Sequence, residues 1–348
     1  MKVKFNNLRI SSISSCVPKD TLDLLTFMNG ENLNDINKII KTTGIDSVRI
    51  ANNNTTTSDL SYIAAELLFS ENDIDRSLID GLIFVSQTGD YRLPQTSHIL
   101  QHRLKLPTNT ICLDLPIGCT GYIYGIYQAS LMIQSKSCKK VLLLAGDTTS
   151  KLINNEDKSL KMVFGDGASA TLIEEGNDDI CCIIHSDGTN FEQLIVPNGG
   201  CRNKQYAPVN EIISDKDGNK RTLNDLYMDG IGIFNFAISK IPPLINEILE
   251  YNSNDDKDID AYILHQANKF MIDYLRKKTK ISIHKMPLKV NGFGNTGSNS
   301  IPLVLTELFS NNSANLNRVL LCGFGVGLSW GAIICDLSKT KILKTIEN

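Results

Sequence analysis

The residue of this sequence with the clearest chemical potential is Cys119. It lies in a tight turn between the apolar run 111–115 and a helical pattern that starts near Thr120. The free backbone amides and the dipole of a helix N-terminus favour the thiolate, the form of cysteine that attacks carbonyl carbons. Most cysteines are small buried residues, but Gly118 and Gly121 leave little bulk beside this sulfur, so a substrate can approach it. We therefore predict that Cys119 is a nucleophile.

Two other polar residues occupy turns of the same kind. His265 follows the apolar run 261–264 and precedes a polar stretch, whereas Asn295 lies in a Gly-Asn-Thr-Gly turn after residues 285–290. A lone histidine after a strand is usually structural, and a Gly-Asn-Thr-Gly sequence forms turns readily without having any function. The functional interpretation therefore rests on Cys119, His265 and Asn295 holding matching positions at the ends of buried strands.

The elements that must position these residues alternate between strands and helices, which is typical of layered α/β proteins with largely parallel strands. Short apolar runs of strand length alternate with longer helical patterns. The predicted strands are residues 81–85, 111–115, 140–145, 261–264, 285–290, 318–322 and 332–337, with a hairpin-like pair near 164–172. The predicted helices are residues 57–69, 95–104, about 120 onward, 234–249 with an interruption at Pro242 and Pro243, 268–278 and a segment ending at 308.

The order of these elements occurs twice, which indicates an internal duplication. Residues 1–175 form a first half that carries Cys119, and residues 176–348 form a second half that carries His265 and Asn295. Two like halves packed together bring their strand ends to one shared site, where open α/β sheets bind ligands. The duplication therefore predicts that the three residues meet.

Composition limits the partners and the compartment. The chain has 348 residues, a net charge of -3 from 35 basic and 38 acidic residues, and nine cysteines without metal-ligand spacing. This balance argues against nucleic acid, and the scattered cysteines are typical of a reducing compartment. We find no apolar run of about 18 residues for membrane insertion and no signal run at the first residues. The expectation is a cytoplasmic enzyme that holds no metal.

Four motifs together resemble one family, that of β-ketoacyl-[acyl-carrier-protein] synthase III, whose members have the thiolase fold. The similarity covers roughly residues 40 to 337, and Thr43-Gly-Ile45 and Phe164-Gly-Asp-Gly-Ala168 are also similar to the family pattern. The four motifs are Asp114-Leu-Pro-Ile-Gly-Cys-Thr-Gly-Tyr122, His265-Gln-Ala-Asn268, Gly294-Asn-Thr-Gly-Ser-Asn-Ser-Ile-Pro302 and Gly325-Val-Gly-Leu-Ser-Trp-Gly331.

The resemblance implies a thiolase-like α-β-α-β-α sandwich and a condensation between two thioesters. Cys119 takes an acyl group from acyl-CoA or an acyl-carrier protein, and malonyl-acyl-carrier protein is the second substrate. His265 and Asn295 stabilise the enolate that decarboxylation leaves, and the backbone amides of Cys119 and Gly327 form the oxyanion hole. CoA and carrier-protein thioesters are substrates, and no cofactor is implied.

Four positions depart from the family pattern and predict a specialised member. Lys38 and Thr42 stand where a tryptophan and an arginine usually hold CoA, and Phe270 replaces an arginine that docks the carrier protein, with Lys269 beside it as a substitute. Leu93 stands where a phenylalanine usually reaches the acyl pocket of the partner in a homodimer. We expect an enzyme of a lipid, O-antigen or secondary-metabolite pathway.

Three other functions are compatible with part of the pattern. Gly292-Phe-Gly-Asn-Thr-Gly297 matches a dinucleotide-binding motif, but no strand ending in an acidic residue follows it about twenty residues on. The order of Cys119, His265 and Asn295 also resembles that of a cysteine hydrolase, without its local motif. The third alternative keeps the fold and transfers the acyl group of Cys119 to an alcohol or an amine.

Overall fold

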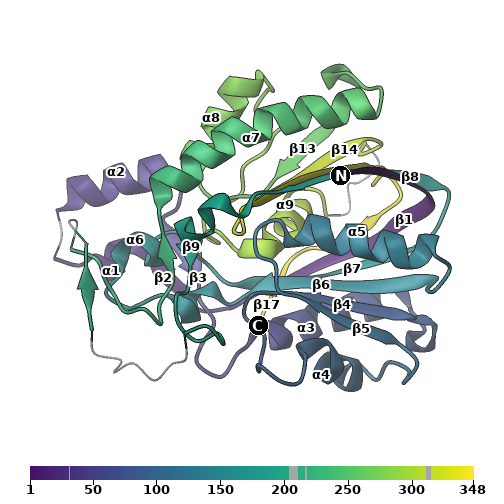
Figure 1. The fold of residues 1–348 in the computed structure, drawn as a ribbon, viewed down its shortest axis with the longest axis horizontal. Coiled ribbons are helices and arrows are strands. Elements are labelled where there is room, and N and C mark those ends of the chain that lie inside the picture. Colours follow the sequence, from purple (N-terminus) through teal and green to yellow (C-terminus); the bar gives the residue numbers. More distant parts are fainter. Residues whose placement is uncertain (31, 204–210, 216–217, 311–314) are drawn as a thin grey trace.

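One strand lies at the centre of the molecule and joins two half-sheets. In the computed structural model, which describes all residues except 31, 204–210, 216–217 and 311–314, β1 (Lys2–Val17) pairs with β7 (Gly167–Glu175) and with β8 (Asp178–Ser186). The sheet runs in the order β13-β14-β15-β8-β1-β7-β6-β4-β5. β1 is therefore shared by the two ends of the sheet (Figure 1).

The strands that precede the predicted catalytic residues lie at opposite ends of this sheet. β4 (Gly81–Val85) pairs in parallel with β5 (Ile111–Leu115) and with β6 (Lys140–Asp147). At the other end, β13 (Ala261–Leu264) pairs in parallel with β14 (Val319–Gly325), which pairs antiparallel with β15 (Ser329–Cys335). Both ends thus contain parallel strands followed by an antiparallel neighbour, as the thiolase fold requires.

Helices form three layers that alternate with the two halves of the sheet. α5 (Gly121–Gln134) and α9 (Ser300–Leu308) lie between the halves, α7 (Gly230–Tyr251) and α8 (Lys269–Thr279) cover one outer face, and α3 (Thr57–Asn72) and α4 (Thr96–Arg103) cover the other (Figure 1). The predicted α-β-α-β-α sandwich is confirmed. The central core unites both halves and includes Ile83, Ile123, Leu143, Ile263, Ile301, Val304 and Leu321.

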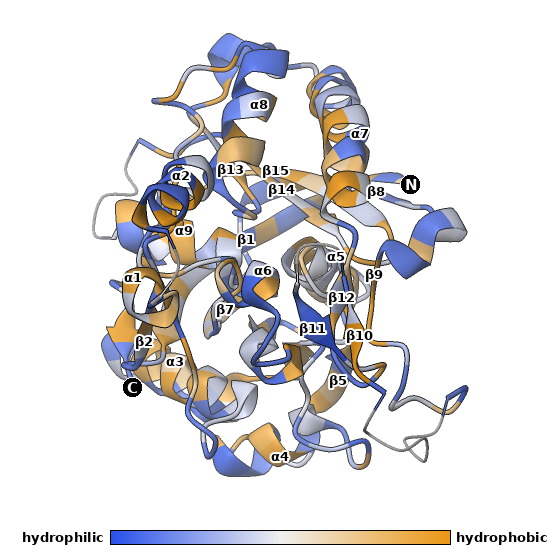
Figure 2. Ribbon diagram, turned by 90° about the vertical axis from the view of Figure 1, so that its left-hand side faces the viewer, coloured by the Kyte–Doolittle hydropathy of each residue, from blue (hydrophilic) through white to orange (hydrophobic). Residues whose placement is uncertain are grey.

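Both faces of β4, β13, β14 and β15 are buried, which explains their near-continuous apolar sequences, whereas β5 at the edge of the sheet is only partly buried. In β4, Ile83 packs in the central core, whereas Leu82 and Phe84 pack in the outer core with α3 and α4. Successive side chains of a strand point to opposite faces, so a strand between two helix layers needs apolar residues throughout. α7 carries both hydrophobic and hydrophilic residues, as expected of a helix with one buried face (Figure 2).

The remaining elements are shorter, and four of them (η2, β9, β12 and η5) contribute residues to the cavities described below. They are β2 (Thr21–Asp23), α1 (Leu24–Phe27), α2 (Leu33–Thr43), β3 (Ser47–Arg49), η1 (Arg76–Leu78), η2 (Thr149–Leu152), α6 (Lys158–Lys161), η3 (Gly188–Gln193), β9 (Leu194–Ile195), β10 (Ile213–Ser214), β11 (Lys220–Arg221), β12 (Tyr227–Met228), η4 (Asp256–Asp258), η5 (Gly297–Asn299), β16 (Lys341–Ile342) and β17 (Ile346–Glu347).

Three sequence-based expectations about the elements are wrong. Residues 285–290 do not form a strand, although the carbonyl of Lys285 accepts a hydrogen bond from Tyr262 of β13 at 2.7 Å. β7 is not half of a hairpin, because β1 and β6 are its neighbours. α7 continues through Pro242 and Pro243, since its long apolar face packs on the sheet and tertiary packing outweighs the local penalty of proline.

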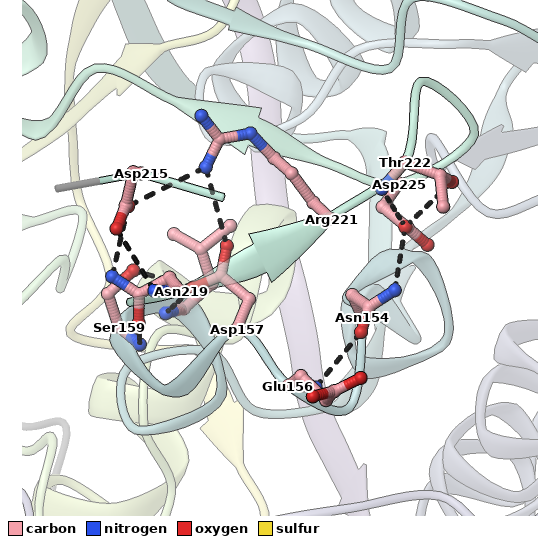
Figure 3. Close-up of polar contacts among 10 residues, drawn as sticks. Asn154, Glu156, Asp157, Ser159, Asp215, Asn219, Arg221, Thr222 and Asp225 are labelled. Atoms are coloured by element: carbon pink, nitrogen blue, oxygen red, sulfur yellow. Dashed lines mark hydrogen bonds and ion pairs between the residues drawn. The ribbon is translucent and has the colours of Figure 1, made fainter. Parts of the chain in front are cut away.

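A polar cluster fixes the connection that covers the site in the second half. The carboxylate of Asp225 accepts hydrogen bonds from the backbone and hydroxyl of Thr222, at 2.6 and 2.8 Å, and from Asn154 at 2.9 Å (Figure 3). The amide of Leu226 then donates to the carbonyl of Leu152 at 2.7 Å. This cluster positions Leu152 and Leu226, whose side chains line a cavity described below.

Close backbone packing beside the site predicts a stability effect at Gly165. A methyl group at this position would overlap the backbone carbonyl of Phe293, whereas one at Gly188 would meet no atom within 4 Å. Because backbone atoms cannot rotate away, we expect Gly165→Ala to lower the free energy of unfolding by about 1–3 kcal/mol. Gly188→Ala should change it little. Urea denaturation followed by circular dichroism compares the two variants, and equal midpoints would contradict the tight contact.

Candidate active site

Two cavities meet at the sulfur of Cys119. The first, the Phe270 cavity, has a volume of about 270 Å³ and an apolar wall that also contains His265 and Asn295. The second, the Gln87 cavity, has a volume of about 230 Å³ and lies beside Gly118 and Val326. Cys119, Phe164 and Leu194 line both cavities. The structure therefore brings the three predicted catalytic residues to one place, with space on two sides of the thiol.

Cys119 lies at the start of the central helix and is nearly buried. It is 9% exposed and precedes Thr120, the N-cap of α5. Burial, with a smaller contribution from the charge of Asp147, raises the pKa of the Cys119 thiol to about 12, although its own amide and that of Val326 oppose the shift. The expected preference for a thiolate is therefore wrong for the empty site, because desolvation outweighs the helix N-terminus.

The second backbone amide at the sulfur belongs to Val326 and not to Gly327. The Val326 amide hydrogen-bonds the thiol, and a methyl group at Gly325 would lie 2.9 Å from the sulfur. A methyl group at Gly327 would meet only Ser329. The sequence assigned the second oxyanion-hole amide to Gly327, and the amide that contacts the sulfur in the structure is that of its neighbour Val326.

His265 is held in one orientation by a neighbouring serine. Its Nδ1 lies 2.6 Å from the hydroxyl oxygen of Ser300, and the ring of Phe324 packs against it edge-on with centroids 5.4 Å apart. Among the described residues, Nε2 makes no hydrogen bond to a side chain. Burial lowers the pKa of His265 to about 4, despite an opposing contact with the backbone of Gly297. The imidazole is therefore neutral at physiological pH.

Asn295 is oriented by its own turn. Its side-chain oxygen accepts a hydrogen bond from the amide of Gly297 at 3.1 Å, so the nitrogen of the carboxamide is the group left for a ligand. Its backbone is fixed by two hydrogen bonds, one to the carbonyl of Val163 at 2.8 Å and one from the amide of Gly165 at 3.1 Å. The Phe270 cavity thus contains two neutral side chains, each with one nitrogen unoccupied.

Sequence reasoning missed Asp147, a buried carboxylate behind the thiol. Its oxygens accept hydrogen bonds from the amides of Gln87 and Ser298, at 2.8 and 3.1 Å, and from the hydroxyls of Ser86 and Ser298, at 3.2 and 3.0 Å. Burial raises the pKa of Asp147 to about 6. The sequence could have indicated Asp147 through its position at the end of β6. This strand is parallel to β4, and the carboxyl ends of parallel strands lie at the same edge of a sheet.

The other predicted site residues lie outside the reaction centre. Leu93 is 85% exposed and lines neither cavity. The ammonium group of Lys269 pairs with the carboxylate of Asp273. Phe270 lines the first cavity while remaining half exposed, and it packs against Phe234 with ring centroids 5.1 Å apart. The mouth of the Phe270 cavity is thus aromatic, with a paired lysine beside it.

Comparison with known proteins gives the same assignment for both halves of the chain. Residues 113–189 match the family model described as 3-oxoacyl-[acyl-carrier-protein (ACP)] synthase III, and residues 249–337 match the model of the C-terminal part of that enzyme. These two segments contain the predicted nucleophile and the predicted histidine–asparagine pair, respectively.

Whole-chain similarity extends to named relatives and to a solved structure. The β-ketoacyl-[acyl-carrier-protein] synthase III of Campylobacter fetus is 32% identical over 93% of this chain and 97% of its own length. The enzyme of the same name from Clostridium perfringens is 34% identical over 81% and 85%. The crystal structure of a 3-oxoacyl-(acyl-carrier protein) synthase from Burkholderia xenovorans superimposes with a TM-score of 0.93 at 34% identity, covering 100% of this chain and 99% of that one. With the fold and the sequence identity that it shares with these proteins over most of its length, the chain belongs to the 3-oxoacyl-[acyl-carrier-protein] synthase III family.

Proposed function

We propose that this enzyme loads an acyl group on Cys119 and condenses it with malonyl-acyl-carrier protein, with loss of carbon dioxide. The observation that carries the proposal is the meeting of two cavities at one thiol. The Gln87 cavity holds the acyl chain, and the Phe270 cavity admits the malonyl thioester to His265 and Asn295. A site for two thioesters needs these two compartments, whereas hydrolysis needs one substrate and water.

When the acyl group is transferred to the enzyme, the proton of the Cys119 thiol moves to the leaving group. The sulfur of Cys119 attacks the thioester carbonyl of acyl-CoA or acyl-carrier protein, the bond to the departing sulfur breaks, and the thiol proton ends on that leaving thiolate. The tetrahedral oxyanion is bound by the amides of Cys119 and Val326, the two that reach the sulfur in the empty site. No permanent charge on Cys119 is needed.

Condensation uses the two neutral donors. Nε2–H of His265 and the amide N–H of Asn295 donate to the thioester oxygen of the malonyl group, and they stabilise the enolate that forms as carbon dioxide leaves. With the proton on Nε2, Nδ1 accepts a hydrogen bond from the hydroxyl of Ser300, 2.6 Å away. The enolate carbon attacks the acyl carbon and releases the Cys119 thiolate, which then takes up a proton. One preorganised donor contributes about 3–4 kcal/mol to such a step.

The proposal includes a carrier protein and a second copy of the chain. Lys269, beside Phe270 at the start of α8, and the exposed Lys277 and Lys278 in the last turn of the same helix offer positive charge to an acidic carrier. Lys38, at the position of the usual CoA contact, is exposed and pairs with Asp35 at 2.8 Å. An exposed Leu93 favours a homodimer in which this residue contacts the partner.

We place the enzyme in a specialised lipid, O-antigen or secondary-metabolite pathway, located in the cytoplasm. The altered positions Lys38, Phe270 and Leu93 support this placement. No helix in the described ranges is both long and apolar enough to cross a membrane. The named relatives are synthases, so we do not favour transfer of the acyl group to an alcohol or an amine.

The division of roles predicts that Asn295→Ala separates the two half-reactions. Self-acylation, followed by intact-protein mass spectrometry, should remain measurable, because Asn295 acts only on the malonyl thioester. Release of carbon dioxide from malonyl-carrier protein should fall by about 10²-fold or more, the usual result of removing one oxyanion donor.

Cys119→Ala is the matched control, because it should abolish acylation and, with it, condensation. Equal losses of acylation and condensation in Asn295→Ala would contradict the assigned roles. Retention of the acyl adduct in Cys119→Ala would contradict the nucleophile.

The raised pKa of Cys119 predicts slow, pH-dependent alkylation. Only the thiolate reacts with iodoacetamide, and below a pKa of about 12 its fraction rises about tenfold for each pH unit. The rate of modification of the Cys119 peptide should therefore increase steadily between about pH 7 and pH 9. Peptide mapping distinguishes it from the other thiols, with Cys119→Ala as the blank, and a plateau within this range would contradict the protonated resting state.

A further inference from the structure

The Gln87 cavity contains polar groups that the proposed mechanism does not use. Its wall is largely apolar, as expected for a site that holds a hydrocarbon chain, but Gln87 and Thr149 also line it. The apolar part of the wall includes Leu152, Ile195, Val196 and Leu226. Within the described part of the chain, the side chains of Gln87 and Thr149 have no hydrogen-bond partner. A cavity for an unsubstituted acyl chain has no need of such groups.

Gln87 is fixed close to the nucleophile. It follows β4, and its backbone amide is tied to the carboxylate of Asp147 at 2.8 Å. A methyl group at Gly118 would overlap Oε1 of Gln87 and would lie 2.8 Å from the side chain of Val326. The carboxamide therefore lies against the residue that precedes Cys119, on the side of the cavity where the first carbons of an acyl group would lie.

The neighbouring polar groups leave Gln87 as the main recognition element. Asp147 also lines the cavity, but both of its oxygens already accept hydrogen bonds. Thr149 begins η2 and is partly buried, with a hydroxyl that can donate or accept. A carboxamide has both a donor and an acceptor. Gln87 and Thr149 together can bind a hydroxyl or oxo group. A substituent of this kind is small enough to fit the cavity and can hydrogen-bond both side chains.

We propose that Gln87 is a specificity residue, and that the acyl group accepted by Cys119 carries a hydroxyl or oxo substituent near its carbonyl, as in a 3-hydroxyacyl thioester. This inference rests on the proposed function, since it concerns the donor of the same reaction. An unsubstituted chain displaces water from the carboxamide and offers no hydrogen bond in return, whereas the substituted chain replaces that water. Sites that bind a hydroxyl group discriminate against analogues that lack it.

A competition between two four-carbon donors tests the inference. The enzyme is incubated with equal amounts of 3-hydroxybutyryl and butyryl thioesters, on CoA and on acyl-carrier protein, and the adducts on Cys119 are counted by mass spectrometry. Because Gln87 is exposed, we expect a preference of about tenfold for the hydroxylated group, well below that of a fully enclosed hydroxyl site. The two donors differ only in one hydroxyl, so the ratio isolates its recognition.

Variants then assign the preference to the side chain. In Gln87→Met, which keeps the length of the side chain, the ratio should fall to about one, and Thr149→Val should reduce it less. Gln95→Leu is the matched control, because Gln95 is exposed on the same connection and lines neither cavity. Its ratio should equal that of the unaltered enzyme.

Each outcome separates this inference from the proposed function. Equal loading of the two donors by the unaltered enzyme, or preference for butyryl, overturns the inference while leaving condensation intact. An unchanged preference in Gln87→Met also overturns it. Failure of both donors to acylate Cys119 counts against the proposed function itself.

Discussion

The carboxylate of Asp147 is the contact on which the geometry of the site depends. Placing an ionised group beyond the reach of water costs several kcal/mol, and four hydrogen bonds to this carboxylate offset that cost. Gln87 belongs to the end of a strand in the first half, whereas Ser298 belongs to the loop that carries Asn295 in the second. One buried side chain therefore sets the spacing between the two halves, and with it the distance from the thiol to its partners.

Burial has a common effect on the predicted catalytic residues Cys119 and His265. It raises the pKa of the Cys119 thiol and lowers that of the His265 imidazole, so both are neutral before substrate arrives. The carboxamide of Asn295 does not titrate and is therefore neutral as well. Charge then develops in the transition states, where fixed N–H groups in a site with little water stabilise it most effectively. The hydroxyl of Ser300 contacts Nδ1 of His265, and the amide of Gly297 occupies the side-chain oxygen of Asn295, which leaves its nitrogen available. Hydrogen bonds from neutral groups therefore orient these two side chains.

Much of this arrangement could be predicted from local pattern. The apolar runs located β4, β5, β6 and β13, and their duplicated order placed Cys119, His265 and Asn295 at one edge. Local pattern failed where tertiary contacts decide the outcome. The packed face of α7 overrides its two prolines, residues 285–290 lie beside β13 without becoming a strand, and the sulfur meets the amide of Val326 and not that of Gly327. The pKa of Cys119 was misjudged for the same reason, because desolvation depends on the whole surrounding structure and leaves no trace in a short motif.

The two cavities share only Cys119, Phe164 and Leu194. Most wall residues of one chamber can therefore vary without disturbing the other. Substitutions at Leu152 or Leu226 would reshape the Gln87 cavity, while the wall residues of the Phe270 cavity keep their places. Such a partition gives evolution independent control over the two building blocks. It offers a physical route by which one ancestral fold can serve many biosynthetic branches while its bond-forming step stays the same.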